Sequence, residues 1–296
     1  MVKEINGVKI RKDKVKRTKG EKILFAIAFV IILIHSTSFL LGYATIFLNT
    51  FKSADEYLDT SIFAFPEKWD FTNYLKVFTS FTVNGNGYFR MVGNTLLFSL
   101  TGSIPSLIST AFASYACARY KFFGRKAVYM INVICITVSF PGSQVAYYKL
   151  WTDLQMINSW KYLLGCFGGF GSQFIILYGF WKSVDWAYAE AAYIDGGSEF
   201  TVLLKVMFPQ VLPMLGVFFI LGFIGGWTSY EFTMLYMPKF PSIGYGLFLY
   251  QYEMQRSMNM PLYFAALMIT AVPSLILFWF FQDRILVSVN IGGLKG

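Results

Sequence analysis

The chain has few charged residues. Asp, Glu, Lys and Arg make up 14% of its 296 residues, whereas 56% are hydrophobic. A soluble domain has about 25% charged and about 45–50% apolar residues. The composition is therefore that of a protein embedded in a bilayer. Intrinsic disorder is also excluded, because a chain so poor in charge, with 32 Phe and 19 Tyr, collapses.

The sequence is also poor in residues that build metal or catalytic sites. Cys117, Cys135 and Cys166 form no paired framework and are interpreted as small buried hydrophobes. His35 is the only histidine, which excludes a histidine-based metal site. A GxxxxGK(S/T) loop is absent, and the glycine-rich stretch 165–171 lies inside an apolar run with no strand before it. We therefore expect no catalytic residue, no metal and no cofactor bound by this chain, which disfavours a membrane-embedded enzyme.

Six apolar runs are long enough to cross a hydrocarbon core, which needs about 20 residues. Strands of an outer-membrane barrel would instead alternate polar and apolar residues over about 10 positions. The sequence thus predicts an all-α membrane protein with six transmembrane helices. The predicted spans are Ile23–Leu48, Gly93–Ala118, Ala127–Leu150, Tyr162–Trp181, Val211–Met237 and Leu262–Gln282.

The placement of the basic residues predicts the orientation. Most of the +9 net charge comes from the head, Met1–Lys22, and from the loop Arg119–Lys126, which has no acidic residue. The first outer loop, Asn49–Val92, has more acidic than basic residues. By the positive-inside rule the head and the basic loop are cytoplasmic, and six spans place both termini inside.

The basic head could alternatively bind nucleic acid. We disfavour this because the head directly precedes a transmembrane helix, where basic clusters hold the topology and meet anionic lipid. The first apolar run is too long for a signal peptide and lacks a well-placed cleavage site. The chain is therefore divided into a basic cytoplasmic head, residues 1–22, and one transmembrane domain, residues 23–296.

Small residues and prolines indicate a packed helical bundle. In the second run, small residues recur every four positions, which allows close helix approach in lipid. Glycines of the fourth and fifth runs could be packing points or hinges, and the prolines within runs are expected to kink their helices. These positions are Gly102, Ser106, Thr110, Ser114 and Ala118; Gly168, Gly169, Gly171, Gly222, Gly225 and Gly226; and Pro105, Pro141 and Pro273.

The loop 182–210 is cytoplasmic by parity, yet four acidic residues outnumber its two basic ones. Residues 186–194 are rich in Ala and predict a short helix, which Gly196-Gly197 ends. Ser198 is expected to cap a second helix, Glu199–Phe208, which Pro209 ends. From these residues alone, the helix–Gly–helix elbow fits equally well a surface that docks a partner protein and an elbow that lies on lipid.

The same loop resembles the EAA loop of ABC importer permease subunits. That pattern is Glu-Ala-Ala, three residues, Gly, nine residues, then Ile-x-Leu-Pro. Here it is matched by Glu190-Ala191-Ala192, Gly196 and Pro209 with the correct spacing, while Val206 and Phe208 replace the Ile and Leu. Asp195 before the glycine is typical of the sugar branch of this family.

Other segments are similar to the maltose-permease type of this family. The similarity covers the chain from about Ile23 to its end and leaves out the head. The segments are Ser114–Ala116 through Arg119–Phe122 and Gly124–Lys126 after the second run, Thr50–Ser53 and Trp69–Tyr74 in the first outer loop, and the tail Asn290–Gly296.

The resemblance implies a subunit that forms half of a carbohydrate translocation pore in a bacterial cell membrane. A second homologous permease subunit would supply the other half, and an extracytoplasmic substrate-binding protein would deliver the sugar. Two ATPase subunits, which use ATP and Mg, would receive the elbow. The implied coupling residues are Glu190, Ala191, Ala192, Asp195, Gly196, Val206, Phe208 and Pro209.

The substrate itself is indicated only by aromatic and polar residues near span ends. Such residues suit a sugar, but Tyr and Trp at span ends also form the ordinary interfacial belt. The partner permease could instead supply the pocket. Glu231 is expected inside the fifth span, where a carboxylate faces a pore, water or a partner. The candidate pathway residues are Gln144, Tyr147, Tyr148, Trp227, Tyr230 and Glu231.

Three alternatives stay open at this point. The outer loop Pro238–Pro261 is an amphipathic connector or, by the resemblance, a segment that reaches the binding protein. The permease could carry a non-sugar solute. A secondary transporter is less favoured, because it would not need the EAA elbow and the sequence shows no inverted repeat.

Overall fold

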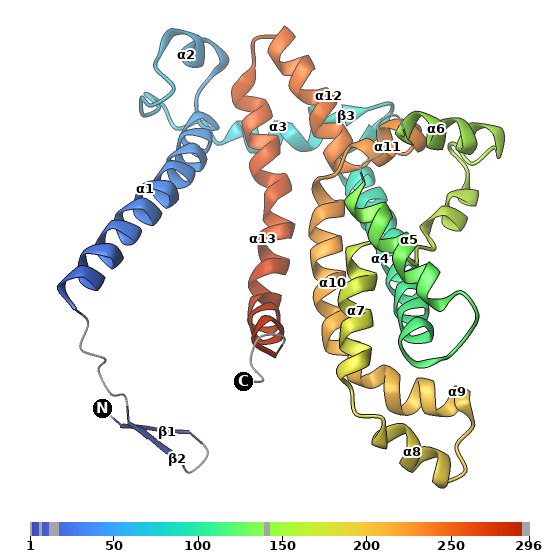
Figure 1. Cartoon of the computed structure of the whole chain (residues 1–296). Helices are drawn as coiled ribbons and strands as arrows, with labels where there is room; N and C mark the ends of the chain where they lie inside the picture. The colour runs from blue at the N-terminus through green and yellow to red at the C-terminus, as the bar shows by residue number, and fades with distance from the viewer. Residues whose placement is uncertain (1, 6–7, 12–17, 139–142, 292–296) are drawn as a thin grey trace.

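The computed structural model describes residues 2–5, 8–11, 18–138 and 143–291, of which 2–5, 8–11 and 281–291 are described by their backbone only. Most of this part of the chain is helical (Figure 1). Two short antiparallel hairpins accompany the helices. They pair β1 (Val2–Ile5) with β2 (Val8–Arg11), and β3 (Thr82–Val83) with β4 (Asn86–Gly87). Pro141, one of the prolines expected to kink a span, lies outside the described residues.

Four helices of the described chain are long and apolar enough to cross a membrane. They correspond to the predicted first, second, fifth and sixth spans. Each extends beyond the predicted run at one end or both. They are α1 (Lys19–Asn49), α4 (Tyr88–Arg119), α10 (Phe208–Thr228, preceded by helical residues from Glu199) and α13 (Met260–Ile291).

The third and fourth predicted spans are not single helices, so the predicted count of six continuous spans is not reproduced. The third run forms α5 (Arg125–Thr137) and α6 (Ser143–Asp153). The fourth forms a 3₁₀ segment, η1 (Trp160–Cys166), and then α7 (Ser172–Ser183). The glycines at 165, 168, 169 and 171 explain the interruption of the fourth run, since glycine disfavours a helix interior.

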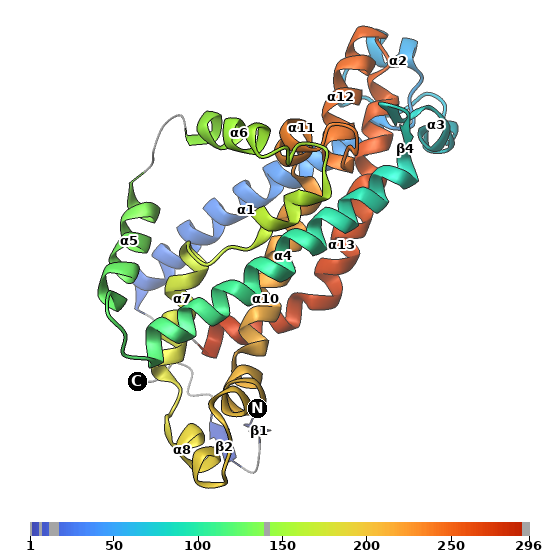
Figure 2. The same cartoon turned by 90° about the vertical axis from the view of Figure 1, so that its right-hand side faces the viewer.

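The bundle is built around α4, which packs against α7 and α10 in both views (Figures 1 and 2). The predicted ribbon of small residues lies in these contacts. A Cβ atom on Gly168 would lie 2.8 Å from Ser106 Oγ, and the Trp181 indole donates to Ser114 Oγ at 3.2 Å. A Cβ atom on Gly226 of α10 would lie 3.0 Å from Ser99 Oγ, and one on Gly222 would lie 3.3 Å from Ser103 Oγ. The small residues therefore let three helices approach closely.

The outer ends of the spans carry shorter helices. Two belong to the first outer loop, one follows α10 and one precedes α13. They are α2 (Ala54–Asp59), α3 (Thr72–Ser80), α11 (Glu231–Tyr236) and α12 (Ile243–Arg256). The connector 238–261 is thus mainly helical.

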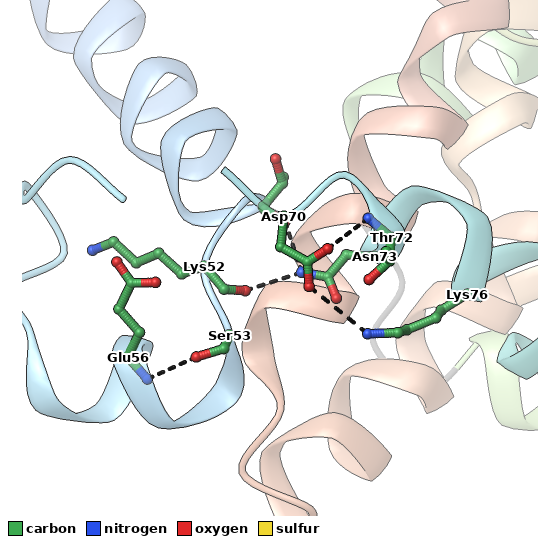
Figure 3. A network of polar contacts seen from close by, with 8 residues as sticks. Lys52, Ser53, Glu56, Asp70, Thr72, Asn73 and Lys76 are labelled. Atoms are coloured by element: carbon green, nitrogen blue, oxygen red, sulfur yellow. Dashed lines mark hydrogen bonds and ion pairs between the residues drawn. The ribbon is translucent and has the colours of Figure 1, made fainter. Parts of the chain in front are cut away.

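A polar network ties the outer end of α1 to α3 (Figure 3). The Lys52 side chain is fully buried, and its ammonium donates to Thr60 Oγ1 at 3.1 Å and to the Ser61 carbonyl at 2.9 Å. Asn73 donates to the Thr50 and Lys52 carbonyls at 2.9 and 3.0 Å. Because buried polar groups are costly without partners, these bonds fix the outer loop in one arrangement.

Candidate functional site

The first part of the elbow, residues 187–201, has the local structure that its sequence predicts. Helix α8 (Ala187–Ile194) ends before Gly196, whose φ of +81° is in the left-handed region. Ser198 caps the next helical segment, because its hydroxyl accepts from the Thr201 amide at 3.3 Å. The segment begins as α9 (Glu199–Thr201). A helix, a glycine break and a capped second helix are therefore confirmed.

The turn between the two helices is tightly closed. Gly196 and Gly197 donate their amides to the Tyr193 and Ala192 carbonyls at 3.0 and 2.9 Å, which satisfies the free carbonyls at the end of α8. A Cβ atom on Gly197 would lie only 2.7 Å from the Ala192 oxygen. Both glycines are therefore required, one for its dihedral angle and the other for lack of space.

The prediction that Pro209 ends the second helix is wrong. Helical backbone continues from α9 through a π-helical segment, η2 (Val202–Met207), directly into α10. Pro209 lies in the first turn of α10, where its missing amide hydrogen removes a hydrogen bond from the ladder. The wider π turns lie directly before it, so the helix changes its hydrogen-bonding pattern instead of ending. The second helix of the elbow thus runs into α10 without a break in its helical backbone, although it changes direction there (Figure 1).

The inner face of the elbow is part of the hydrophobic core. Ala189, Val202 and Met207 are fully buried, in one cluster with Tyr115 of α4 and Trp181 of α7. Tyr115 and Trp181 meet edge to face with ring centres 5.0 Å apart. The elbow is therefore packed directly against the transmembrane helices and shares their hydrophobic core.

Polar contacts add to this packing. Arg119, the last residue of α4, donates to the Val184 carbonyl and lies with its guanidinium 5.2 Å from the centre of the Trp186 ring. The Tyr120 hydroxyl donates to Glu199 at 3.4 Å. Burial, and then the Glu199 carboxylate, raise the pKa of Tyr120, so this phenol stays protonated and keeps donating at neutral pH. Both helices of the elbow are therefore linked to the end of α4.

The opposite face of the elbow is exposed. Of the motif residues, Glu190, Ala191, Asp195, Gly196 and Pro209 are exposed, while Ala192, Val206 and Phe208 are half-buried. Phe208 stacks on Phe112 of α4 with ring centres 5.4 Å apart.

Three large apolar residues on this face were not predicted from the sequence. Tyr188, Ile194 and Phe200 are 58%, 86% and 68% exposed. The sequence feature that could have identified them is the presence of large apolar residues in a loop that otherwise faces water. Exposed apolar residues beside a carboxylate form a surface suited to another protein.

Five of the six candidate pathway residues fall into two groups at the end of the bundle opposite the elbow (Figure 1), and Glu231 belongs to neither. Gln144, Tyr147 and Tyr148 are exposed on α6. The two tyrosine rings lie 5.9 and 6.0 Å from the Tyr236 ring of α11. This group packs beside α11 and is separate from the residues at the end of α10.

The second group surrounds a hollow of about 230 Å³ at the end of α10. Trp227 is buried there, and its indole donates to the Thr270 carbonyl at 3.0 Å. Tyr230 stacks on Phe248 of α12 with ring centres 4.7 Å apart and planes within 3°. The structure therefore brings Trp227 and Tyr230 together with residues of α12 and α13 that the sequence did not single out.

The expectation that Glu231 lies inside a span is wrong. Helix α10 ends at Thr228, Ser229 is extended, and Glu231 is the exposed first residue of α11. As the first residue of α11, this carboxylate lies at the positive end of the helix dipole.

Comparison with known proteins points to the same family that the elbow motif resembles. No protein-family model matches the chain. The diacetylchitobiose uptake system permease protein of Streptomyces coelicolor is 27% identical over 277 residues, covering 91% of this chain and 89% of the relative. The maltodextrin transport system permease protein of Streptococcus pneumoniae is 25% identical, covering 98% and 99%.

A solved structure shows that the fold is shared. It is that of a bacterial ABC transporter involved in the import of the acidic polysaccharide alginate, with a TM-score of 0.75 and 20% identity, covering 90% of this chain and 98% of that chain. The resemblance that the elbow motif indicated is therefore confirmed. In sequence over nearly its whole length, and in fold, the chain is similar to the membrane-embedded permease subunits of ABC importers, and its curated relatives belong to their carbohydrate branch.

Proposed function

We propose that the chain is the permease subunit of an ATP-driven carbohydrate importer and forms half of its translocation pore. The relatives are permeases for several oligosaccharides, and the fold is that of an importer permease. The observation that carries the proposal is the elbow, because it joins an exposed protein-docking face to the transmembrane helices. The chain itself would perform no chemistry, and ATP and Mg would be used by the ATPase partners.

The elbow would receive the movement of an ATPase subunit. Its exposed face offers the Glu190 carboxylate beside Tyr188, Ile194 and Phe200. Its buried face and the Arg119 contacts transmit any displacement to α4, and the unbroken helical backbone transmits it to α10. A rigid element of this kind can bias a pore between two states. Two ATPase subunits would serve the two permease chains, one for each elbow.

A second permease chain would cover α1. This helix is apolar, and none of its most hydrophobic stretch is buried within the chain. A helix that is apolar on all sides lies against lipid or other helices. In Figure 1 it runs apart from the bundle over most of its length and approaches α13 only toward its outer end. It is therefore free to pack on a partner subunit.

The orientation follows from the coupling role. The elbow and the basic loop after α4 lie at the same end of the bundle, which we assign to the cytoplasm (Figure 2). Helices α2, α3, α11 and α12 then lie outside, where a substrate-binding protein would dock. Both termini would be cytoplasmic.

Copurification tests the subunit proposal. A tagged chain, expressed with the genes beside its own and extracted in mild detergent, is expected to bring down an ATPase and a second permease. Glu190→Lys and Gly196→Asp should abolish sugar uptake while membrane insertion is retained. Asp153→Lys is the matched control, because it changes an exposed carboxylate at the end of α6, outside both the elbow and the helices assigned to the binding protein. Copurification of neither partner, or normal uptake in both elbow variants, would refute the proposal.

A further inference from the structure

We propose that the hollow at the outer end of α10 binds one uncharged ring of the transported carbohydrate, so that this chain contributes a sugar subsite of its own. The inference rests on the proposed importer function and extends it to the substrate class. It concerns residues of α10, α12 and α13 that meet only in the folded protein.

The lining of the hollow carries no charge. Its aromatic and polar side chains are Trp227, Tyr230, Phe248, Tyr263, Thr228 and Gln251. Glu231, the nearest carboxylate along the chain, is not among the lining residues. The carboxylate of an acidic sugar would lose its hydration here without gaining a positively charged partner, and this desolvation is costly in free energy. A neutral sugar ring has a much smaller desolvation cost.

Aromatic rings form an apolar part of the lining of the hollow. The parallel Tyr230 and Phe248 rings form one stacked unit, and Tyr252 meets Phe248 edge to face at 5.2 Å. Such rings offer a large, rigid apolar area. A sugar ring has an apolar face of C–H groups that fits against this area, with its hydroxyls directed to the rim.

Polar groups for those hydroxyls are present and unused. The Tyr263 hydroxyl donates to Gln251 Oε1 at 3.5 Å, which orients the amide. Within the described part of the chain, Gln251 Nε2 and the Tyr230 hydroxyl have no hydrogen-bond partner. The hollow thus offers both a donor and an acceptor.

The shape of the hollow is held by a close helix contact. A Cβ atom on Gly244 of α12 would lie 2.7 Å from the Thr228 oxygen and 2.8 Å from the Ser229 oxygen. The first turn of α12 is therefore pressed against the end of α10. At about 230 Å³ the hollow is smaller than the roughly 300 Å³ at which pockets for drug-sized ligands begin. It suits a single ring of a longer chain.

Cysteine protection tests the site directly in the complete importer. Thr228→Cys places a thiol in the hollow, and Gln255→Cys places one on the exposed side of α12, outside the lining. Each is labelled with a small maleimide, with and without maltotetraose or diacetylchitobiose, and read by peptide mass spectrometry so that the native cysteines do not interfere. A neutral sugar should slow labelling of Thr228→Cys at least about fivefold and leave Gln255→Cys unchanged. A tetrasaccharide of uronic acids should protect neither.

Uptake by the same importer separates the two hypotheses. Gln251→Leu should raise KM for the protecting sugar about fivefold, the effect of one lost hydrogen bond, while Gln255→Leu should not. If the wild type imports a neutral sugar but neither protection nor the KM change occurs, the subsite is refuted and the importer function stands. If the wild type imports none of these sugars and copurifies with neither an ATPase nor a second permease, the importer function fails and the subsite fails with it.

Discussion

The guanidinium of Arg119 lies 5.2 Å from the centre of the Trp186 ring, so the last residue of α4 holds the residue that precedes α8. The same side chain donates to the Val184 carbonyl. The end of α4 and the start of α8 are therefore connected through the contacts of this one side chain. Movement of the elbow cannot leave α4 in place unless these contacts break.

Arg119→Leu is expected to loosen the elbow. It removes the hydrogen bond to Val184 and the cation–π contact, which is worth about 0.5–2 kcal/mol. The elbow should then be cut faster in limited proteolysis, and ATP hydrolysis should couple less well to uptake. Lys121→Leu is the control, because it removes one positive charge from an exposed residue only two positions away. Equal proteolysis of both variants and the wild type would contradict the role of Arg119.

Gly197→Ala is expected to distort the elbow turn. The added methyl would lie 2.7 Å from the Ala192 oxygen, and such overpacking costs about 1–3 kcal/mol. Gly196→Ala should cost roughly 1–2 kcal/mol for a different reason, its φ of +81°. Hydrogen exchange over residues 187–201 should accelerate in both. Gly179→Ala, with open space around it in α7, should leave this exchange unchanged.

Gly226→Val is expected to separate α10 from α4. Even the first added carbon would lie 3.0 Å from Ser99 Oγ, whereas Gly225 has nothing within 4 Å. Gly226→Val should therefore lower the thermal unfolding temperature in detergent, by an amount corresponding to about 1–3 kcal/mol. Gly225→Val repeats the substitution one position away. A similar loss in both variants would show that helix propensity, not packing on Ser99, is responsible.

The outer loop should loosen in acid. The Thr72 hydrogen bonds, together with Lys76 at 3.9 Å, lower the pKa of Asp70 below 3.8. A lowered pKa means that this stabilisation is fully present above 3.8 and is lost as the pH falls through the lower, folded value. Hydrogen exchange of residues 71–80, corrected for its intrinsic pH dependence, should therefore lose protection only below pH 3.8. Asp70→Asn should remove that pH dependence; its persistence would assign the effect to another group.

The local structure of the elbow could be predicted because its causes are local. A left-handed glycine and a serine cap act within four residues of their own position. Gly196 and Ser198 behave as their sequence context predicts. The effect of Pro209 could not be predicted in the same way, because a proline can end a helix, kink it or follow a π turn, and packing of Val202 and Met207 selects among these.

The candidate pathway residues at the end of α10 could be predicted from the sequence only in part. Trp227 and Tyr230 were identified by type alone, whereas Phe248, Gln251 and Tyr263 join them from distant helices. Glu231 was misplaced because an apolar window continues past Thr228 although the helix does not. Hydropathy averages over about 19 residues and therefore misses a break of two.

The sequence by itself determined the membrane setting, the charge asymmetry between the two ends, the elbow motif and the ribbon of small residues on the second span. These depend on composition, periodicity and neighbouring residues. Only the structure decided where two expected spans break and that the elbow continues into α10, and only tertiary contacts form the uncharged hollow where α10, α12 and α13 meet. Residues far apart in the chain, such as Gly244 and Thr228, set that hollow, and no local pattern records it.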